Sequence, residues 1–191
     1  MDNIFFELKQ LKYFGEDSII GKMVRIRRPE EVTIGDHTII DDFTYISSAL
    51  EIGAYSHIAS NVVISGGSAK IVIGNFTGIS TGVSIHAQSS EYISASFELP
   101  SIPKSSQIGG ICKDIVINDH VLIGTKSTIM PGVYLPEGFA SSAYSFIPVG
   151  DYEPWTLYGG NPIKKIYRRK NNNKIKKEAE KLLRLINKYE C

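Results

Sequence analysis

An aliphatic residue returns at every sixth position through most of this chain. The clearest stretch runs from residue 117 to residue 147, where successive blocks of six read INDHVL, IGTKST, IMPGVY, LPEGFA and SSAYSF. Four of the five blocks open on Ile or Leu, and an Ile follows the last block. A period of six matches neither an α-helix, at about 3.6 residues, nor a strand with its alternation of about two. It is typical of a solenoid whose coils are built from hexapeptide turns.

The same frame covers the first half of the chain. Seventeen hexads keep the phase, with one shift caused by an insert at Gly66-Gly67-Ser68. They open at residues 20, 26, 34, 40, 46, 52, 58, 64, 73, 79, 85, 117, 123, 129, 135, 141 and 147. Three short strands close one triangular coil, so the hexads predict between five and six coils. Such a prism is roughly 25–30 Å long at ~4.8 Å per coil.

The opening side chain of each hexad is expected to point into this prism and to stack on its counterparts in neighbouring coils. Backbone hydrogen bonds then run from coil to coil, as in a parallel sheet. We therefore expect an all-β domain, a parallel β-helix over residues 20–162.

Three segments lie outside the period. Residues 1–19 are expected to cap the open first coil, which a solenoid needs for solubility, and the apolar spacing in residues 3–13 favours a short helix there. Residues 86–114 abandon the frame, which predicts a functional loop extruded from one corner. Residues 163–191 are expected to form a basic strand followed, from Asn173, by an amphipathic helix.

The charge is unevenly distributed, although the chain as a whole carries only +1. Residues 164–191 contain 11 Lys/Arg and 3 Asp/Glu, a net of +8, which leaves −7 on the remainder. A basic end on an acidic body suits an anionic ligand or partner, but a solvated helix face would have the same composition. The basic residues lie at one end without an interleaved aromatic platform, so nucleic acid is not an expected partner.

The sequence contains no feature of export or membrane insertion. Its two cysteines, Cys112 and Cys191, are too few for a disulfide scaffold. The N-terminus has an acidic second residue and no long apolar core, so it does not match a secretory signal. No stretch approaches the ~18 apolar residues of a membrane span. We expect a soluble cytoplasmic protein without a transmembrane segment.

The frame IGTKSTIMPGVYLPEG, followed by EPWTLYGGNPIKKIYRR, resembles the hexapeptide-repeat acyltransferases. This family includes galactoside, maltose, serine and xenobiotic acetyltransferases and many sugar acetyltransferases of surface-polysaccharide gene clusters. The resemblance covers about residues 20–170. It implies a left-handed parallel β-helix, a homotrimer, and an acyl-CoA donor in the groove between two subunits. It also implies that the acceptor sits near the extruded loop of a neighbouring subunit.

The resemblance suggests an acetyl-CoA-dependent O-acetyltransferase acting on a sugar hydroxyl, in lipopolysaccharide, O-antigen or capsule biosynthesis. The absence of a nucleotide-binding domain before the repeats favours this reaction. The alternative is an N-acetyltransferase acting on a nucleotide-linked amino sugar, and a more remote one is a non-catalytic trimeric scaffold. A γ-type carbonic anhydrase shares the fold but needs two zinc-binding histidines five residues apart. The spacings here are 20, 29 and 34, so no metal is expected.

Acyl transfer from a thioester needs a base for the acceptor's proton, and histidine suits that role. His37 and His120 occupy the fourth position of a hexad, a solvent-side corner where histidine is ordinary. His57 stands in HIASNVVISGG, which is similar to an HI-x-x-N-V-x-I-x-G-G pattern of sugar acetyltransferases. It is a candidate base, although a corner histidine bonded to a neighbouring carbonyl is an equal alternative.

His86 opens the extruded loop and is the second candidate base. Galactoside-type enzymes carry their catalytic histidine within a T-G-H-P motif of the equivalent loop. This sequence departs from that motif, with Gln88, Ser89 and Ser90 in the matching places. The hexad frame stacks His57 on Gly78 and separates the two histidines within one subunit, so they are expected to meet only across a groove between subunits.

The remaining candidates are binding residues. Glu91 and Tyr92 in the loop, with Asn75 and Phe76 in the preceding coil, are candidates for the acceptor, although simple corner packing would also explain Phe76. Small or basic residues near the C-terminal coils are candidates for the cofactor. These are Gly124, Ser142, Trp155, Gly160, Lys164, Lys165 and Arg168. Trp155 would equally serve to seal the last coil.

Overall fold

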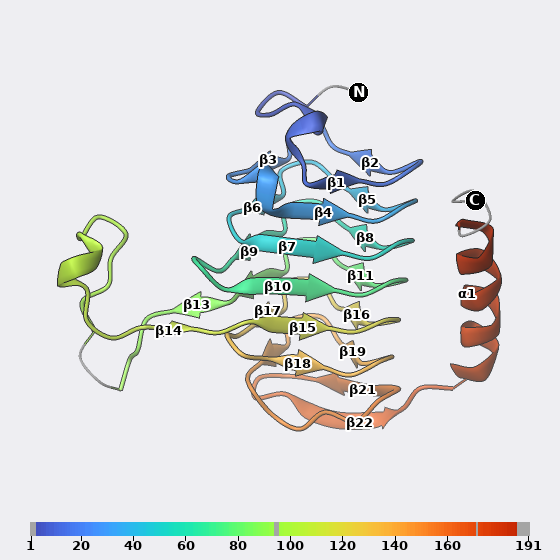
Figure 1. The fold of residues 1–191 in the computed structure, drawn as a ribbon. Helices are drawn as coiled ribbons and strands as arrows, with labels where there is room; N and C mark the ends of the chain where they lie inside the picture. Colours follow the sequence, from blue (N-terminus) through green and yellow to red (C-terminus); the bar gives the residue numbers. More distant parts are fainter. Residues whose placement is uncertain (1–2, 94–95, 171, 187–191) are drawn as a thin grey trace.

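Three sheets run along the molecule, one on each side of a triangular solenoid (Figure 1). The computed structural model describes residues 3–93, 96–170 and 172–186. Sheet A consists of β1 (Tyr13–Phe14), β4 (Val32–Ile34), β7 (Ala49–Ile52), β10 (Lys70–Ile73), β15 (Ile115–Ile117) and β18 (Tyr134–Leu135). Sheet B consists of β2 (Ile19–Ile20), β5 (Ile39–Ile40), β8 (His57–Ile58), β11 (Gly78–Ile79), β16 (Leu122–Ile123), β19 (Ala140–Ser141), β21 (Thr156–Gly159) and β22 (Lys164–Arg168). Sheet C consists of β3 (Arg25–Ile26), β6 (Tyr45–Ile46), β9 (Val63–Ser65), β12 (Ser84–His86), β17 (Thr128–Ile129) and β20 (Phe146–Ile147).

Each coil adds one strand to each sheet, and neighbouring coils pair in parallel. The described residues form six full coils, and β21 begins a seventh. This exceeds the predicted number because the first coil opens at Tyr13, before the first recognised hexad. The coils wind with a left hand, as the resemblance implied (Figure 1).

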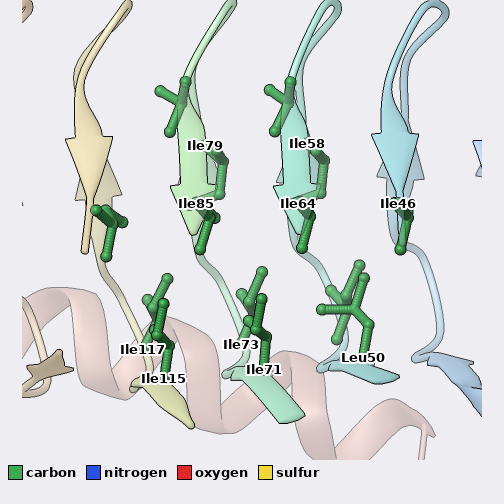
Figure 2. Packing of buried hydrophobic residues seen from close by; sticks show 14 of the residues in the cluster. Ile46, Leu50, Ile58, Ile64, Ile71, Ile73, Ile79, Ile85, Ile115 and Ile117 are labelled. Atoms are coloured by element: carbon green, nitrogen blue, oxygen red, sulfur yellow. The ribbon is translucent and has the colours of Figure 1, made fainter. Parts of the chain in front are cut away.

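The predicted core is confirmed. All seventeen residues that open a hexad are buried, and the least buried of them is Ser141, at 7% exposed. Figure 2 shows how they stack in rows parallel to the solenoid axis: Ile46, Ile64 and Ile85 form one row, and Ile58 and Ile79 another. The insert at residues 66–68 is accommodated at a corner, so Ile71 and Ile73 rejoin the stack through β10, which pairs in register with β7 and β15.

The corner between sheets A and B carries a column of aromatic rings. Its members are His37, Tyr55, Phe76, His120 and Trp155, one from each of five coils. Successive ring centroids lie 4.7, 5.2, 5.2 and 5.5 Å apart. Each residue has a positive φ, between 53° and 61°, which costs a non-glycine residue roughly 1–2 kcal/mol. Ring stacking between coils offsets part of this cost.

The coil between those of His120 and Trp155 contributes no ring to the column. Gly138 occupies its corner with φ of 70°, and a side chain there would overlap the indole of Trp155. The glycine therefore lets Trp155 reach past its own neighbour to His120.

The C-terminal helix α1 (Asn172–Ile186) runs back along this corner, from the last coil toward the first (Figure 1). Near its start, Lys176 lies over the Trp155 ring and pairs with Glu137 at 2.7 Å. Farther along, the Tyr55 hydroxyl donates to the Leu182 carbonyl at 3.5 Å. The helix expected from Asn173 is confirmed, and β22, which leads to it, pairs antiparallel with β21.

The short helix expected over residues 3–13 is wrong. The segment contains only the 3-10 turn η1 (Leu8–Gln10) before β1 begins. Phe6 and Leu11 are nevertheless buried against the core of the first coil. The apolar spacing correctly marked residues that cover the end of the prism, but these residues reach the core without forming an α-helix. A second 3-10 turn, η2 (Pro29–Glu31), joins the first two coils.

The loop predicted from residue 86 forms an arm that leaves the corner between sheets C and A (Figure 1). Its base is an antiparallel pair, β13 (Gln88–Ser89) with β14 (Ile111–Cys112). Farther out, Phe97 and Ile108 form an isolated antiparallel bridge, and η3 (Lys104–Ser106) lies between them in sequence. The arm is therefore ordered by its own backbone pairing, and the coils continue on either side of it without loss of register.

The inward stack predicts that two neighbouring side chains of one strand contribute very differently to the free energy of unfolding. Ile71→Ala empties a fully buried position in β10 and is expected to lower the free energy of unfolding by ~2–5 kcal/mol. Val72→Ala, one residue away on the outer face, is expected to cost about 1 kcal/mol or less. Urea denaturation at one fixed protein concentration measures both. Equal losses would show that the column of inward side chains does not dominate stability.

Candidate functional site

A histidine and a carboxylate form a pair on the outer face of sheet B. His57 Nε2 lies 2.8 Å from Asp41 Oδ2, and both side chains are about half exposed. Asp41 directly follows β5, one coil before His57. An ionised carboxylate only accepts hydrogen bonds, so in the neutral imidazole Nε2 carries the proton and Nδ1 keeps the lone pair. This arrangement is that of a base oriented by a third group.

A depression of about 350 Å³ extends from His57 along sheet B toward the last coils. Gly78 pairs with His57 on one side and with Leu122 on the other, so the predicted stacking of His57 on Gly78 is confirmed. Gly124 and Ser141 line the far end of the depression. The small residues leave the backbone open to an extended ligand. Gly124 is also required by the fold, because a side chain there would overlap the backbone of the next coil at Ser142.

His86 lies elsewhere, at the end of β12 in sheet C, where the arm begins. Its Nδ1 is 2.9 Å from Ser65 Oγ, on the preceding coil. Burial lowers the pKa of His86, which favours a neutral imidazole. The two candidate bases therefore stand on different sheets, as the hexad frame predicted, and do not contact each other within one subunit.

Two of the four residues expected to bind the acceptor belong to the corner between sheets A and B. Asn75 accepts the Ala54 N–H at 2.8 Å and its amide group lies 3.4 Å from both carboxylate oxygens of Asp119. Phe76 has a ring stacked on each face, Tyr55 on one side and His120 on the other. Within one subunit these contacts fit the alternative of corner packing for Phe76, and the role of both residues in binding the acceptor stays a prediction.

The other two expected acceptor residues lie on the arm. Glu91 Oε1 accepts the backbone N–H of Ile93 at 3.0 Å, and Tyr92 is 85% exposed. They are separated from the corner residues by the width of the prism. The four predicted residues therefore do not come together within one subunit.

Trp155 is 4% exposed and is enclosed by the column, by Gly138 and by the Arg169 guanidinium, which lies 5.4 Å from the ring centroid. This burial fits the alternative of a seal over the last coils, and a contact between Trp155 and the cofactor stays a prediction. Arg169, which the sequence did not single out, holds this seal by donating to the carbonyls of His120 and Gly138 at 2.9 and 2.8 Å.

The basic residues expected to meet the cofactor lie on β22. Lys164 and Arg168 are exposed, whereas Lys165 pairs with Glu153 at 2.7 Å. Gly160, with φ of 98°, turns the chain between β21 and β22. Ser142 Oγ lies 3.3 Å from the hydroxyl of Ser145.

Within residues 3–93, 96–170 and 172–186, no three His, Cys, Asp or Glu side chains converge as a metal site would require. In the same part of the chain, no helix has the length and apolar character needed to cross a membrane.

Comparison with known proteins agrees with the coil and its period. The model of the family described as "Bacterial transferase hexapeptide (six repeats)" matches residues 31–66. The dTDP-4-amino-4,6-dideoxy-D-glucose acyltransferase of Escherichia coli is 31% identical over 174 residues, which cover 88% of this chain and 88% of the relative. This chain belongs to the hexapeptide-repeat acyltransferase family. The resemblance noted in the sequence is confirmed, and the protein is an acyltransferase.

Other members of the family extend the comparison. The structure of AntD, an N-acyltransferase from Bacillus cereus solved with dTDP and 3-hydroxybutyryl-CoA, superposes with a TM-score of 0.84. The match has 30% identity and covers 97% of this chain and 99% of AntD. A second AntD structure, of the same TM-score, contains dTDP-4-amino-4,6-dideoxyglucose and coenzyme A. A chloramphenicol acetyltransferase of Agrobacterium fabrum is 26% identical over 72% of this chain and 70% of its own.

The burial of His120 predicts that the stability of the protein depends on pH. Burial, the largest effect, and the cations Lys176 and Arg169 lower its pKa, while Asp119 and Glu137 oppose them. Because the unfolded chain then binds more protons than the folded one, stability falls as the pH drops through the ordinary histidine range.

His120→Phe keeps a ring in the column and removes this titration. We expect the free energy of unfolding of the variant to fall less than that of the wild type between about pH 7 and about pH 5. Urea denaturation at a series of pH values measures both slopes. Identical slopes would mean that His120 does not titrate differently in the folded protein.

Proposed function

We propose that this protein transfers an acyl group from acyl-CoA to the amino group of a nucleotide-linked amino sugar. The observation that carries the proposal is the match to the Escherichia coli dTDP-4-amino-4,6-dideoxy-D-glucose acyltransferase and to AntD over nearly the whole chain. These relatives favour the N-acylation that the sequence left as an alternative over transfer to a sugar hydroxyl.

The reaction forms one bond and breaks one. The amine nitrogen attacks the thioester carbonyl carbon, forming the C–N bond and a tetrahedral oxyanion. The nitrogen gives up its proton to a base, the C–S bond breaks, and the sulfur leaves as thiolate and is protonated to free CoA. The product is the N-acylated sugar. Proton removal and stabilisation of the oxyanion are the protein's contributions.

His57 is proposed as the base. Its Nδ1 lone pair is free to receive the amine proton, since Nε2 is engaged with Asp41. The adjacent carboxylate would fix the ring and stabilise the imidazolium that forms. His86 is assigned to the acceptor side, because it stands at the root of the arm and contacts Ser65.

Coenzyme A is proposed to lie along the depression beside His57. An extended pantetheine would cross several coils at ~4.8 Å each and bring its phosphates toward Lys164 and Arg168 on β22. Both cations belong to sheet B, as does the depression.

A homotrimer is proposed to complete this slot. The outer face of sheet B exposes Ile19, Ile39 and Leu122, at 58%, 36% and 47%. Their exposure together on one face suits burial against a second copy. That copy would convert the open depression into a groove between subunits and place another arm beside it.

The function is tested by measuring thiol release from acetyl-CoA and from 3-hydroxybutyryl-CoA. The acceptors are dTDP-4-amino-4,6-dideoxyglucose and the matched sugar with a 4-hydroxyl in place of the amine. We expect release, and an N-acylated product by mass spectrometry, with the amine alone. Equal release with the hydroxyl sugar would favour O-transfer, and no release with either would overturn the proposal.

The base is tested by His57→Gln, which should lower kcat by roughly 10²–10⁴ while leaving the oligomer intact. Asp41→Asn should give a smaller loss in the same direction, because it only disturbs the orientation of the ring. His37→Gln, in the aromatic column, serves as the control for loss of a histidine. Normal turnover by His57→Gln together with a large loss in His86→Gln would move the base to His86.

A further inference from the structure

A polar cavity of about 470 Å³ separates the arm from the corner between sheets C and A. This volume is within the usual range of ligand sites, ~300–1,000 Å³. Arg27 and Ser65 line it from the coils, and Gln88, Glu98 and Lys104 line it from the arm. Ser65 also contacts His86, so the cavity adjoins one of the two candidate histidines.

Glu98 is held in this cavity by its neighbours on the arm. The Phe97–Ile108 bridge, with N–O distances of 2.7 and 2.9 Å, fixes the backbone beside it. Its carboxylate lies over Gly110, where any side chain would overlap it and where φ is 91°. The arm is thus shaped around this one side chain.

One oxygen of that carboxylate is left without a partner. Glu98 Oε1 is buried and receives no hydrogen bond from any residue that the structure describes. Leaving a buried acceptor unpaired costs roughly 1–3 kcal/mol, and more when it is charged. A donor that arrives with a ligand would recover this energy.

The cavity also presents two cations on its wall. Arg27 and Lys104 are exposed, and neither forms an ion pair within the described parts of the chain. The neighbouring Arg28 differs, because it pairs with Glu31 at 3.0 Å and donates to the Gly67 carbonyl at 2.6 Å. Arg27 and Lys104 are therefore free to meet an anion, and phosphate oxygens suit both side chains.

We propose that this cavity is the acceptor subsite, in which Glu98 binds the amino group of the sugar and Arg27 and Lys104 bind its diphosphate. The inference rests on the proposed function and adds the residues that select the acceptor. A cationic amine adds charge–charge attraction to its hydrogen bond with the carboxylate, and a neutral hydroxyl lacks that attraction. Glu98 thereby selects an amino sugar over its hydroxyl counterpart when the acceptor binds. The bound amine gives its extra proton to solvent before it attacks the thioester.

The first test measures binding by calorimetry without acyl-CoA, so that it does not depend on turnover. The ligands are dTDP, dTDP-4-amino-4,6-dideoxyglucose and the 4-hydroxyl counterpart. We expect the wild type to bind the amine about tenfold more tightly than the hydroxyl sugar. Glu98→Gln, which keeps the shape of the side chain, should abolish that ratio and leave the affinity for dTDP unchanged. Glu30→Gln, an equal loss of charge outside the cavity lining, should preserve the ratio.

The second test separates the diphosphate contacts from the amine contact. Arg27→Gln and Lys104→Gln should weaken all three ligands by a similar factor of about ten and keep the amine-to-hydroxyl ratio. Arg25→Gln, a nearby exposed cation that does not line the cavity, should change none of the affinities.

Three results would overturn the inference. In the first, the amine-to-hydroxyl affinity ratio is unchanged in Glu98→Gln. In the second, the affinities for dTDP and for the amino sugar fall equally in that variant, which would indicate a structural role of Glu98 in the arm. In the third, the wild type acylates the amino sugar but binds it no more tightly than the hydroxyl sugar. In each case N-acylation by the wild type would leave the proposed function standing, whereas absence of both binding and acylation would remove the function itself.

Discussion

The narrow interior of the prism constrains everything else in this protein. A strand sends one or two side chains into it, as β10 does with Ile71 and Ile73, and these side chains pack on their equivalents one coil above and below. Ile58, Ile64 and Ile73 are therefore surrounded chiefly by other aliphatic residues of similar size. Such a core tolerates neither a missing methyl group nor a change of phase, because both are felt by the adjacent coils. Insertions are accepted only at corners, which is where residues 66–68 and the arm leave the stack.

The inward stack also decides where chemistry is placed. The residue before each buried aliphatic faces outward, so one outward column of sheet B runs through His57, Gly78 and Leu122. These positions have little part in filling the core and are open to polar or small residues. The family can thus change its ligands on the outer faces while the coil stays the same. The proposed cofactor slot and acceptor subsite are both on outer faces or corners, not in the core.

The aromatic column at the corner between sheets A and B has a structural role. Five residues adopt a left-handed backbone conformation there, and their rings lie on one another from coil to coil. Gly138 leaves the gap that Trp155 fills, and Arg169 and Lys176 then close over the indole. Some basic residues of the C-terminal segment, Arg169 and Lys176, therefore hold α1 against the solenoid. Others, the exposed cations of β22, remain available to an anionic ligand.

The sequence by itself determined the solenoid, its core residues, the arm, and the helix from Asn173. Each of these follows from a local repeat of apolar residues or from the point where the repeat stops. It also predicted that the two candidate histidines, His57 and His86, lie apart within one subunit, since the hexad frame assigns every residue to a sheet. Only the tertiary structure decided which partners meet across coils. Asp41 reaches His57 from the preceding coil, Phe76 loses both faces to neighbouring rings, and Glu98 lies over Gly110 on an arm that has no period. A repeat fixes the direction in which each side chain points, but contacts between coils depend on side chains that are far apart in the chain, and the folding of the arm depends on its own backbone pairing.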